Sequence, residues 1–342
     1  MKRTGNLLER IVQRDNLQLA FHRAFQGKRD RPDARQYASD LEANLYRMAA
    51  EVVSGEFPVG RCWQFTIYDP KERVITAPCF EERVLHHAIM NVCEPLFERF
   101  LIGATFACRR GKGRIAALEH AMRYSRRFPL LLKLDVRKYF DSISHEVLAE
   151  RLKRRFKDPR LLDLFGRIID SCHTWPGRGL PIGSLTSQHL ANFYLGWFDR
   201  FVKESLGATG YVRYMDDCAI WGADRGKMRD VLARCEAFLD TELALAVKPT
   251  PLIVPGRRGF EFLGCRVYPD HLKLNRRSRS RFRRKLFDLE AAYARGEIDE
   301  GTLQRRATGL IAFTTAGGTR SWKFRTRVLQ HLPVSGQRAR TG

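Results

Sequence analysis

The spacing of apolar residues changes several times along the 342-residue chain, and each change predicts a different element. Over residues 1–60 apolar positions recur every three or four residues, as in packing helices. Residues 63–77 alternate around a polar turn, which predicts a β-hairpin with Lys71 and Arg73 near its tip. The period becomes helical again over 82–97. We therefore expect an N-terminal part made of helices and one hairpin.

The middle of the chain carries two further strand signals. Residues 129–136 form a nearly continuous apolar run around Asp135, as expected of a buried strand that brings a carboxylate to its edge. Residues 210–221 contain two short apolar runs on either side of Tyr214-Met215-Asp216-Asp217, which predicts a hairpin with two carboxylates at its turn. Between these strands, the glycine-rich segment 179–188 leads into a helix with one apolar stripe.

The composition changes near residue 270. After short strands predicted over 260–268, residues 273–285 hold eight basic side chains among thirteen residues and no acid. Charges of one sign repel each other and favour phosphate binding, so we expect a basic helical domain over 270–342. The residues expected to contact nucleic acid there are Arg276, Arg277, Arg281 and Arg284.

Overall charge narrows the class of protein. The chain is 44% hydrophobic, enough for a sizeable core, and its formal net charge is +23. Such a basic folded chain favours a polyanionic partner, first of all nucleic acid. The glycine-punctuated loop 107–114 precedes a predicted helix, and its Arg109, Arg110 and Lys112 are expected to contact a template or primer backbone. The loop lacks the Gly-Lys-Ser/Thr ending of a Walker loop.

Cysteine usage and hydropathy predict the compartment. The eight cysteines include no Cys-x-x-Cys pair, so neither disulfides nor zinc is indicated. The N-terminus lacks a hydrophobic signal region, and no apolar run is long enough to span a bilayer. We expect a cytoplasmic protein with no membrane partner.

Three carboxylates are the candidate catalytic groups. Adjacent aspartates at a tight turn repel each other unless a cation lies between them. Asp135 and Asp216 are each predicted at a strand end, so a sheet that pairs those strands brings the carboxylates together. Such a set can hold two Mg²⁺ ions roughly 3.5–4 Å apart for phosphoryl transfer to a nucleotide, because hard cations prefer oxygen ligands.

The order of these motifs resembles that of the reverse transcriptases. In that family a strand ending in aspartate, a Gly-x-x-x-Ser helix entry and a Tyr-x-Asp-Asp hairpin belong to the palm, with fingers before it and a thumb after it. The resemblance implies an α+β right-hand polymerase fold. Its expected parts are an N-terminal helical extension over 1–60, fingers over 61–128 with part of 142–178, a palm over 129–269 and a thumb over 270–342.

The resemblance also implies roles for single residues. The implied metal set, for two Mg²⁺ ions that Mn²⁺ can replace, is Asp135, Val136, Asp216 and Asp217, of which the three aspartates are catalytic. Phe140 would be the gate that excludes a 2′-hydroxyl. The residues implied at the incoming dNTP are Lys71, Arg73, Arg83, Phe140, Ile182, Gly183 and Gln188. The family often has Lys-Thr where this chain has Lys248-Pro249-Thr250, so no proton-donor role is assigned to Lys248.

A narrower match is Ile-Gly-Ser-Leu-Thr-Ser-Gln over residues 182–188. It looks like the Ile-Gly-x-x-x-Ser-Gln form of diversity-generating retroelement reverse transcriptases, where other members usually have Gln-Gly-x-x-x-Ser-Pro. This resemblance implies error-prone copying of a template-repeat RNA, with misincorporation at adenines. The implied partners are template RNA, the RNA–cDNA duplex, dNTPs and a small basic accessory protein oligomer, in a bacterial, archaeal or phage setting.

Two other functions stay open. A retron, CRISPR-associated or group II intron-like reverse transcriptase of ordinary fidelity would carry the same aspartates. A non-catalytic RNA-binding scaffold would need only the net charge of +23. Three converging acids in a basic protein argue against the scaffold.

Overall fold

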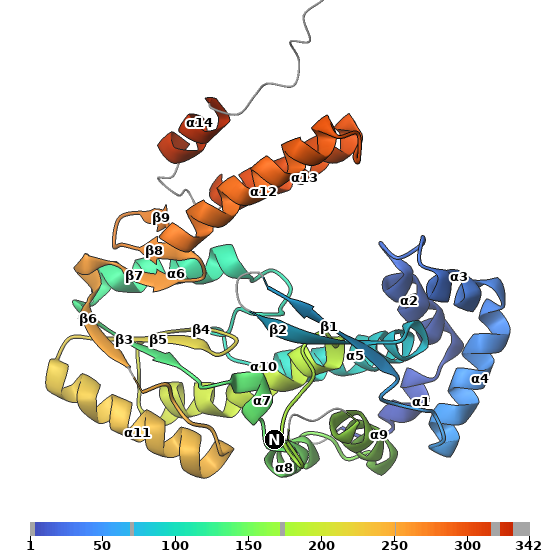
Figure 1. The fold of residues 1–342 in the computed structure, drawn as a ribbon. Coiled ribbons are helices and arrows are strands. Elements are labelled where there is room, and N and C mark those ends of the chain that lie inside the picture. The colour runs from blue at the N-terminus through green and yellow to red at the C-terminus, as the bar shows by residue number, and fades with distance from the viewer. Residues whose placement is uncertain (1–3, 69–71, 172–174, 250, 316–321, 331–342) are drawn as a thin grey trace, which may run out of the picture.

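The computed structural model describes residues 4–68, 72–171, 175–249, 251–315 and 322–330. The N-terminal helices are α1 (Leu7–Ile11), α2 (Arg14–Phe25), α3 (Pro32–Ser39) and α4 (Leu41–Ser54). Three of the four, α1 to α3, pack against one long helix, α5 (Phe80–Phe100), and α4 packs on α2 and α3, as Figure 1 shows. The buried residues of all four helices share one apolar cluster with α5, so the first 60 residues contribute to the main core of the molecule.

The predicted hairpin is confirmed as β1 (Cys62–Ile67) and β2 (Arg73–Pro78), an antiparallel pair in which Ile67 lies opposite Arg73. Its outer part is not covered by the core, because Phe65 and Val74 are both about half exposed. Near the inner end, the Thr76 amide donates a hydrogen bond of 2.8 Å to the carbonyl of Ile182. The hairpin is thus joined to the glycine-rich segment that was predicted to approach a ligand.

A four-stranded antiparallel sheet forms the centre of the molecule, in the order β4-β5-β3-β6. Its strands are β3 (Leu130–Asp135), β4 (Gly210–Tyr214), β5 (Asp217–Gly222) and β6 (Leu252–Pro255). Alternate residues point to opposite faces of a sheet. Leu132 and Leu134 accordingly belong to one apolar cluster, and Leu131 belongs to the other.

Helices cover both faces of this sheet. Figure 1 shows α6 (Arg114–Arg127) on one side, and α10 (Leu185–Arg200) and α11 (Arg225–Leu243) on the other. The short helix α7 (Tyr139–Ser142) follows β3, and α8 (His145–Lys153) and α9 (Pro159–Asp170) come next. A single π-helical turn, Phe201–Ser205, extends α10. The fold is α+β, as the sequence predicted.

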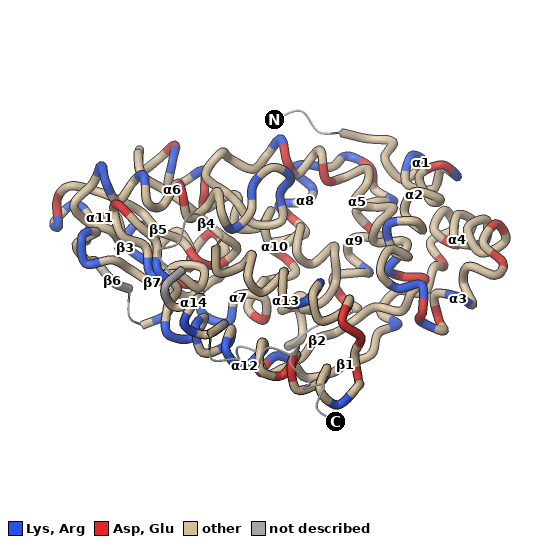
Figure 2. The backbone as a smooth tube through the Cα atoms, turned by 90° about the horizontal axis from the view of Figure 1, so that it is seen from above, with Lys and Arg blue, Asp and Glu red and all other residues tan. Residues whose placement is uncertain are grey.

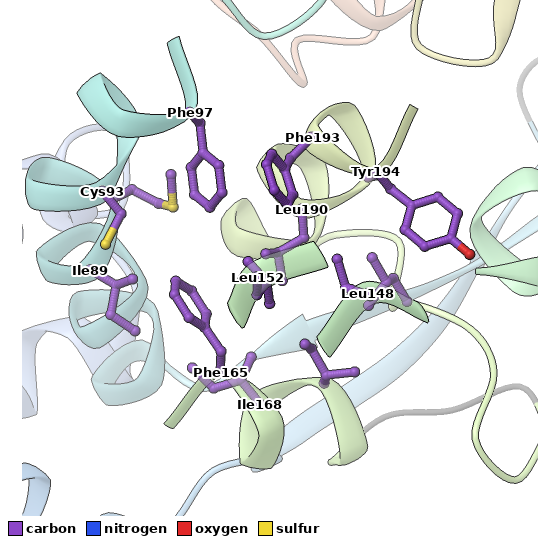
Figure 3. Packing of buried hydrophobic residues seen from close by; sticks show 14 of the residues in the cluster. Ile89, Cys93, Phe97, Leu148, Leu152, Phe165, Ile168, Leu190, Phe193 and Tyr194 are labelled. Carbon is purple, nitrogen blue, oxygen red and sulfur yellow. The ribbon is translucent and has the colours of Figure 1, made fainter. Parts of the chain in front are cut away.

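Aromatic and aliphatic side chains from helices α5, α8, α9 and α10 meet in the main core. Figure 3 shows Phe97, Phe165 and Phe193 turned toward one another. Their ring centroids are 5.1 Å apart for Phe97 and Phe193 and 6.5 Å apart for Phe97 and Phe165, within the range of favourable ring contacts. This core fixes α10, which in turn supports the central sheet.

The C-terminal part begins with a small three-stranded sheet. Its strands are β7 (Phe260–Phe262), β8 (Cys265–Val267) and β9 (Leu272–Leu274), and its apolar residues pack with α6. The helices α12 (Arg276–Ala294), α13 (Glu300–Thr315) and α14 (Trp322–Gln330) follow. The Asn275 side chain caps α12 by accepting a hydrogen bond of 2.8 Å from the Ser278 amide. Among the described residues, no helix combines the length and the apolar character needed to cross a bilayer.

Candidate active site

Strand register brings two of the three predicted carboxylates face to face. Asp135, the last residue of β3, lies directly opposite Asp217, the first residue of β5. Residues in register on antiparallel strands point to the same face of the sheet. That face is the one from which Leu131 and Ala219 pack toward α6 and the small sheet. The expected pairing of the two strands is therefore confirmed.

The turn that holds Asp216 is a two-residue loop, because Tyr214 pairs with Asp217. Met215 adopts a φ of 55° there, a left-handed conformation that is uncommon for a residue other than glycine. The carbonyl of Met215 accepts a hydrogen bond of 2.8 Å from Nη1 of Arg213. The buried Arg213 guanidinium thus helps to stabilise the strained turn from the α10 side of the hairpin.

Arg213 belongs to a fully buried polar network, which we call the hairpin anchor: Thr105, Asn192, Asp199, Tyr211 and Arg213. The Arg213 guanidinium donates to both carboxylate oxygens of Asp199 at 2.6 Å. The Asp199 carboxylate also accepts hydrogen bonds from the Tyr211 hydroxyl at 2.6 Å and the Thr105 hydroxyl at 2.7 Å. Burial alone would lower the pKa of Arg213, but the Asp199 carboxylate raises it. The anchor joins α10, the 104–107 segment and the hairpin.

The carboxylates on the opposite face are poorly compensated. Burial raises the pKa of Asp217 to about 7, Lys133 opposes this shift, and the charges of Asp216 and Asp135 add to it. Burial also raises the pKa of Asp216; Asp135 acts in the same direction, while Lys248 and Arg73 oppose it. The raised pKa values therefore come first from burial of the two carboxyl groups and then from the negative charges of neighbouring aspartates, which the nearby cations oppose.

Two lysines lie against these carboxylates. The Lys248 ammonium is 2.5 Å from Oδ2 of Asp135, and the Lys248 amide donates to the Asp135 carbonyl at 2.9 Å. The Lys133 ammonium is 3.5 Å from Oδ1 of Asp217 and donates at 2.6 Å to the Glu261 carbonyl. The structure therefore places Lys248 in the site, although Pro249 interrupts the Lys-Thr pattern.

The donor set fits a divalent cation held together with substrate oxygens. Oδ1 of Asp135 and Oδ1 of Asp217 are buried and have no hydrogen-bond partner among the described residues. Nowhere in the described part of the chain do three His, Cys, Asp or Glu side chains form a ready-made metal cluster. Mg²⁺ keeps waters and substrate phosphates in its shell and needs few protein ligands. Hence two buried carboxylate oxygens that make no hydrogen bond to the described residues, one of them 3.5 Å from the Lys133 ammonium, are compatible with such an ion beside Asp216.

A cavity of about 540 Å³ lies between the β1–β2 hairpin and the segment before α10. Arg73, Thr76, Asp141 and Ile182 are among the residues that line it. The next residue, Gly183, has a φ of 123°, and a Cβ there would lie 2.9 Å from the Thr76 carbonyl oxygen. Only glycine lets this segment pass so close to β2. The structure thus brings Arg73, Ile182 and Gly183 together, and their role at the dNTP stays a prediction.

The other residues predicted at the dNTP do not line this cavity or lie outside the described chain. Phe140 is half-buried on α7, beside Tyr139 with ring centroids 5.6 Å apart. Gln188 is exposed, and its Oε1 lies 3.5 Å from Sγ of Cys108. Arg83 is partly buried next to Arg31. Lys71 lies outside the described residues.

Val136 follows Asp135 and is bridged to Val247 across the sheet. The hydrogen bonds of this bridge run from the Lys248 amide to the Asp135 carbonyl and from the Arg137 amide to the Ala246 carbonyl. They leave the Val136 carbonyl out of the pairing. The side chain of Val136 is buried in the main core, so only its backbone could serve a metal.

The basic loop before α6 has a mainly structural arginine. The Arg109 guanidinium lies 2.8 Å from the Glu98 carboxylate and donates to the carbonyls of Ile102 and Thr105. A phosphate contact by Arg109 is therefore not favoured in this geometry. Lys112 donates to the Gly103 carbonyl and lies over the Phe106 ring. Arg110 is exposed and lies 3.9 Å from Glu94.

The four arginines predicted on the C-terminal helix share one cavity. Arg276, Arg277, Arg281 and Arg284 line a space of about 440 Å³ on α12. Tyr68, which follows β1 and is 73% exposed, lines the same space from the hairpin. Cationic side chains and an aromatic ring therefore face one another across the opening between the hairpin and α12.

Sequence reasoning missed Lys133 and the hairpin anchor. Lys133 precedes Asp135 by two positions, so strand periodicity alone places both side chains on one face. The anchor had a weaker signal: a charged Arg213 between the apolar Val212 and the aromatic Tyr214, and an Asp199 within an apolar helix. These two charges are 14 positions apart on different elements, so no local periodicity links them.

An antiparallel sheet that presents paired carboxylates between a hairpin and a basic helix defines a nucleic-acid polymerase of the right-hand fold. The family described as "Reverse transcriptase (RNA-dependent DNA polymerase)" matches residues 69–267. This chain belongs to that family, and it is an RNA-directed DNA polymerase.

Curated relatives of this chain are distant. Protein YkfC of Escherichia coli (strain K12) is 23% identical over 66% of this chain and 72% of its own length. Group II intron-encoded protein LtrA of Lactococcus lactis subsp. cremoris is 24% identical over 43% of this chain. The match spans 26% of LtrA and 20% of Nuclear intron maturase 4, mitochondrial, of Arabidopsis thaliana. The chain therefore matches only about a quarter or less of the length of each of these two relatives.

Telomerases are among the similar solved structures. Telomerase from Candida tropicalis in complex with the TWJ fragment of telomeric RNA has a TM-score of 0.47 and 9% identity, over 82% of this chain and 58% of that chain. Telomerase from Candida albicans with a TWJ fragment has a TM-score of 0.45 and 11% identity, over 78% of this chain and 55% of that chain. At these scores the likeness adds nothing to the family match.

Proposed function

We propose that Asp135, Asp216 and Asp217 are the metal ligands of the polymerase reaction. The observation that carries this proposal is the register of β3 and β5, which sets Asp135 opposite Asp217. Each residue keeps one buried oxygen that makes no hydrogen bond within the described part of the chain, and the Asp217 oxygen has only the Lys133 ammonium 3.5 Å away. Two Mg²⁺ ions bound there would supply the positive charge that phosphoryl transfer needs at the attacking and leaving oxygens. The family's use of divalent metal ions agrees with this assignment.

The remaining residues bind and orient the substrates. Arg73 lines the cavity shared with Ile182 and lies close enough to Asp216 to lower that residue's pKa, which suits binding of the triphosphate. Lys71, which lies outside the described residues, keeps its predicted role at the triphosphate. Phe140, on the helix that follows Asp135, is the proposed gate against a 2′-hydroxyl. We assign binding of the template RNA and the RNA–cDNA duplex to the α12 arginines and Tyr68, which is supported by their lining one cavity.

The test is extension of a DNA primer on an RNA template by the full chain. The double variant Asp216→Asn/Asp217→Asn should lose about 10³-fold or more in dNTP incorporation, because several kcal/mol of transition-state stabilisation are removed. Asp230→Asn is the matched control, since Asp230 is exposed on α11. The proposal fails if the double variant extends primers as fast as the control.

We further propose that the chain is the error-prone polymerase of a diversity-generating retroelement. Support comes from Ile182-Gly183 and Gln188 in the helix entry, and from the position of Ile182 on the wall of the Arg73 cavity. A branched apolar side chain offers the incoming nucleotide no hydrogen bond, which weakens geometric selection. The template-repeat RNA and a small basic accessory oligomer would be the partners of that reaction.

A second candidate is a group II intron-like reverse transcriptase of ordinary fidelity, favoured by relatives named as intron-encoded proteins. Sequencing of cDNA made from a defined RNA separates the two. The diversity-generating reading expects errors concentrated at template adenines, fewer of them in Ile182→Gln, and no change in Ile182→Val. Errors spread evenly over the four template bases would favour the second candidate.

A further inference from the structure

A second cationic cavity lies on the side of α10 that faces away from the sheet. It has a volume of about 760 Å³ and lies between the end of α5, the end of α8 and the second half of α10. Residues 192 and 199 of α10 bind Arg213 on the sheet side. Residues 193, 197 and 200 line the cavity, with the spacing of a separate helix face. None of the proposed metal ligands lines it.

The charged side chains that line this cavity are mostly positive. Its cations are Lys153, Arg154, Arg155 and Arg200, and Glu150 is the single acid in its lining. Figure 2 shows Lys and Arg positions gathered along α8 where that helix passes α10. Lys153 pairs with Glu150 at 2.7 Å, and Arg200 pairs with Glu204 at 2.6 Å. Among the described residues, no ion pair is recorded for Arg154 or Arg155.

Arg155 is the least expected member of the set, because it is 6% exposed. Its Nε and Nη2 donate to one neutral acceptor, the Leu96 carbonyl, at 3.1 and 2.7 Å. Burial lowers the pKa of Arg155, and the charges of Arg99 and Arg200 lower it further. A buried guanidinium without a counter-charge is costly, and an anion in the cavity would offset that cost.

Aromatic rings form the floor of the cavity, with unused donors beside them. Phe100, Phe193 and Trp197 contribute the rings. The Arg154 guanidinium lies 5.6 Å from the centre of the Trp197 ring. Nε1 of Trp197 and Nε of Arg200 are both buried without a hydrogen-bond partner among the described residues. Phe100 and Phe193 are almost fully buried, so the half-buried Trp197 is the ring that a bound strand can reach. Cations beside this ring suit a nucleic-acid strand, because its phosphates pair with the charges while a base stacks on the ring.

We propose that this cavity binds backbone phosphates of an RNA segment outside the primer–template duplex. The proposal rests on membership of an RNA-templated family, and it concerns a face of the protein that the polymerase site does not use. A bound RNA strand would neutralise Arg154 and Arg155 and tether the template RNA to the back of α10. Free inorganic phosphate shares this chemistry, so the experiment must separate the two sources.

The test compares the full chain with Lys153→Glu/Arg154→Glu and with the control Arg229→Glu/Arg234→Glu, which makes the same charge change at exposed positions of α11. The probe is a labelled single-stranded RNA, titrated at several salt concentrations. The cavity variant should lose at least about tenfold in affinity, and its salt slope should fall by roughly one to two. The control should change less than about threefold, because exposed distant charges are screened.

Three further readouts decide the outcome. Extension of a short primer–template should remain at the wild-type rate in the cavity variant, whereas failure of the polymerase proposal would appear in the aspartate variants. Ultraviolet crosslinking to RNA should label the Trp197 peptide of the unmodified protein, which is independent of any folding defect in a variant. Equal RNA affinity and salt slope in the cavity variant and the control overturn the proposal. The proposal is also overturned if the cavity variant loses affinity for inorganic phosphate or for poly-glutamate but keeps its affinity for RNA.

Discussion

The two faces of the β4–β5 hairpin treat charge in opposite ways. On the α10 face, the hairpin anchor buries Arg213 and Asp199 with every carboxylate oxygen hydrogen-bonded. On the other face, Asp135 and Asp217 each keep one buried oxygen that makes no hydrogen bond among the described residues, although the Lys133 ammonium lies 3.5 Å from that of Asp217. A saturated buried polar network, in which every group is hydrogen-bonded, stabilises one geometry. On the unsaturated face, carboxylate oxygens that make no hydrogen bond to the described residues remain available to a cation. The hairpin thus combines a rigid support with a site ready for a cation.

The largest effect should follow from breaking the saturated face. Asp199→Asn leaves the Arg213 guanidinium buried without a counter-charge, and we expect the free energy of unfolding to fall by about 3–5 kcal/mol. Urea denaturation measures this loss. Asp230→Asn, at an exposed position, should change the free energy by less than about 0.5 kcal/mol. A loss below about 1 kcal/mol in Asp199→Asn would mean that the anchor does not depend on its charge pair.

The same substitution on the unsaturated face should act in the opposite direction. Asp217→Asn removes a buried charge whose pKa is raised to about 7 by burial. We expect the metal-free protein to gain about 1–2 kcal/mol of stability at pH 8, while primer extension falls. Urea denaturation of metal-free protein gives the result.

The pH dependence of that gain has a definite sign. The folded pKa of Asp217 lies above the unfolded value, so its favourable contribution is complete below about pH 4 and is lost as the pH rises through 7. The gain from Asp217→Asn should therefore be larger at pH 8 than at pH 5. An equal gain at both values would contradict burial of the Asp217 charge.

The smallest effect is expected at the Lys248–Asp135 pair. Both side chains are about two-fifths exposed, so water screens their attraction. Lys248→Met should change the free energy of unfolding by less than about 1 kcal/mol, as exposed ion pairs usually do. A change of several kcal/mol would show that Lys248 is a structural part of the site rather than an ion that a metal can displace.

Local pattern predicted the elements of the site well. The run that ends at Asp135 became β3, and the two apolar runs around Tyr214 to Asp217 became β4 and β5. Pairing of this hairpin with β3 could be expected because it brings the adjacent carboxylates close to Asp135, where all three can share a cation. The fold class followed from the order of motifs. The strand β6 was not predicted, because its four residues lie beside Pro251 and include Pro255, which are poor strand signals.

Contacts that depend on distant segments could not be predicted. Asp199 and Arg213 are both charged residues in apolar surroundings, and nothing local indicates that they face each other. Lys248 lies 113 positions after Asp135 in the sequence. The two come together because Val136 and Val247 form a β-bridge in the folded protein. The roles of Phe140, Gln188 and the α12 arginines stay predictions, because these residues act on ligands.

The most direct test of the two-faced hairpin is the effect of Mg²⁺ on thermal unfolding. At [Mg²⁺] ten times the dissociation constant, binding adds about 1.4 kcal/mol, which is roughly 2–3 °C for a chain of this size. We predict such a rise for the wild-type protein and for Asp230→Asn, and none for Asp217→Asn. An equal rise in Asp217→Asn, or no rise in the wild-type protein at any Mg²⁺ concentration, would contradict a metal site at the Asp135–Asp217 edge.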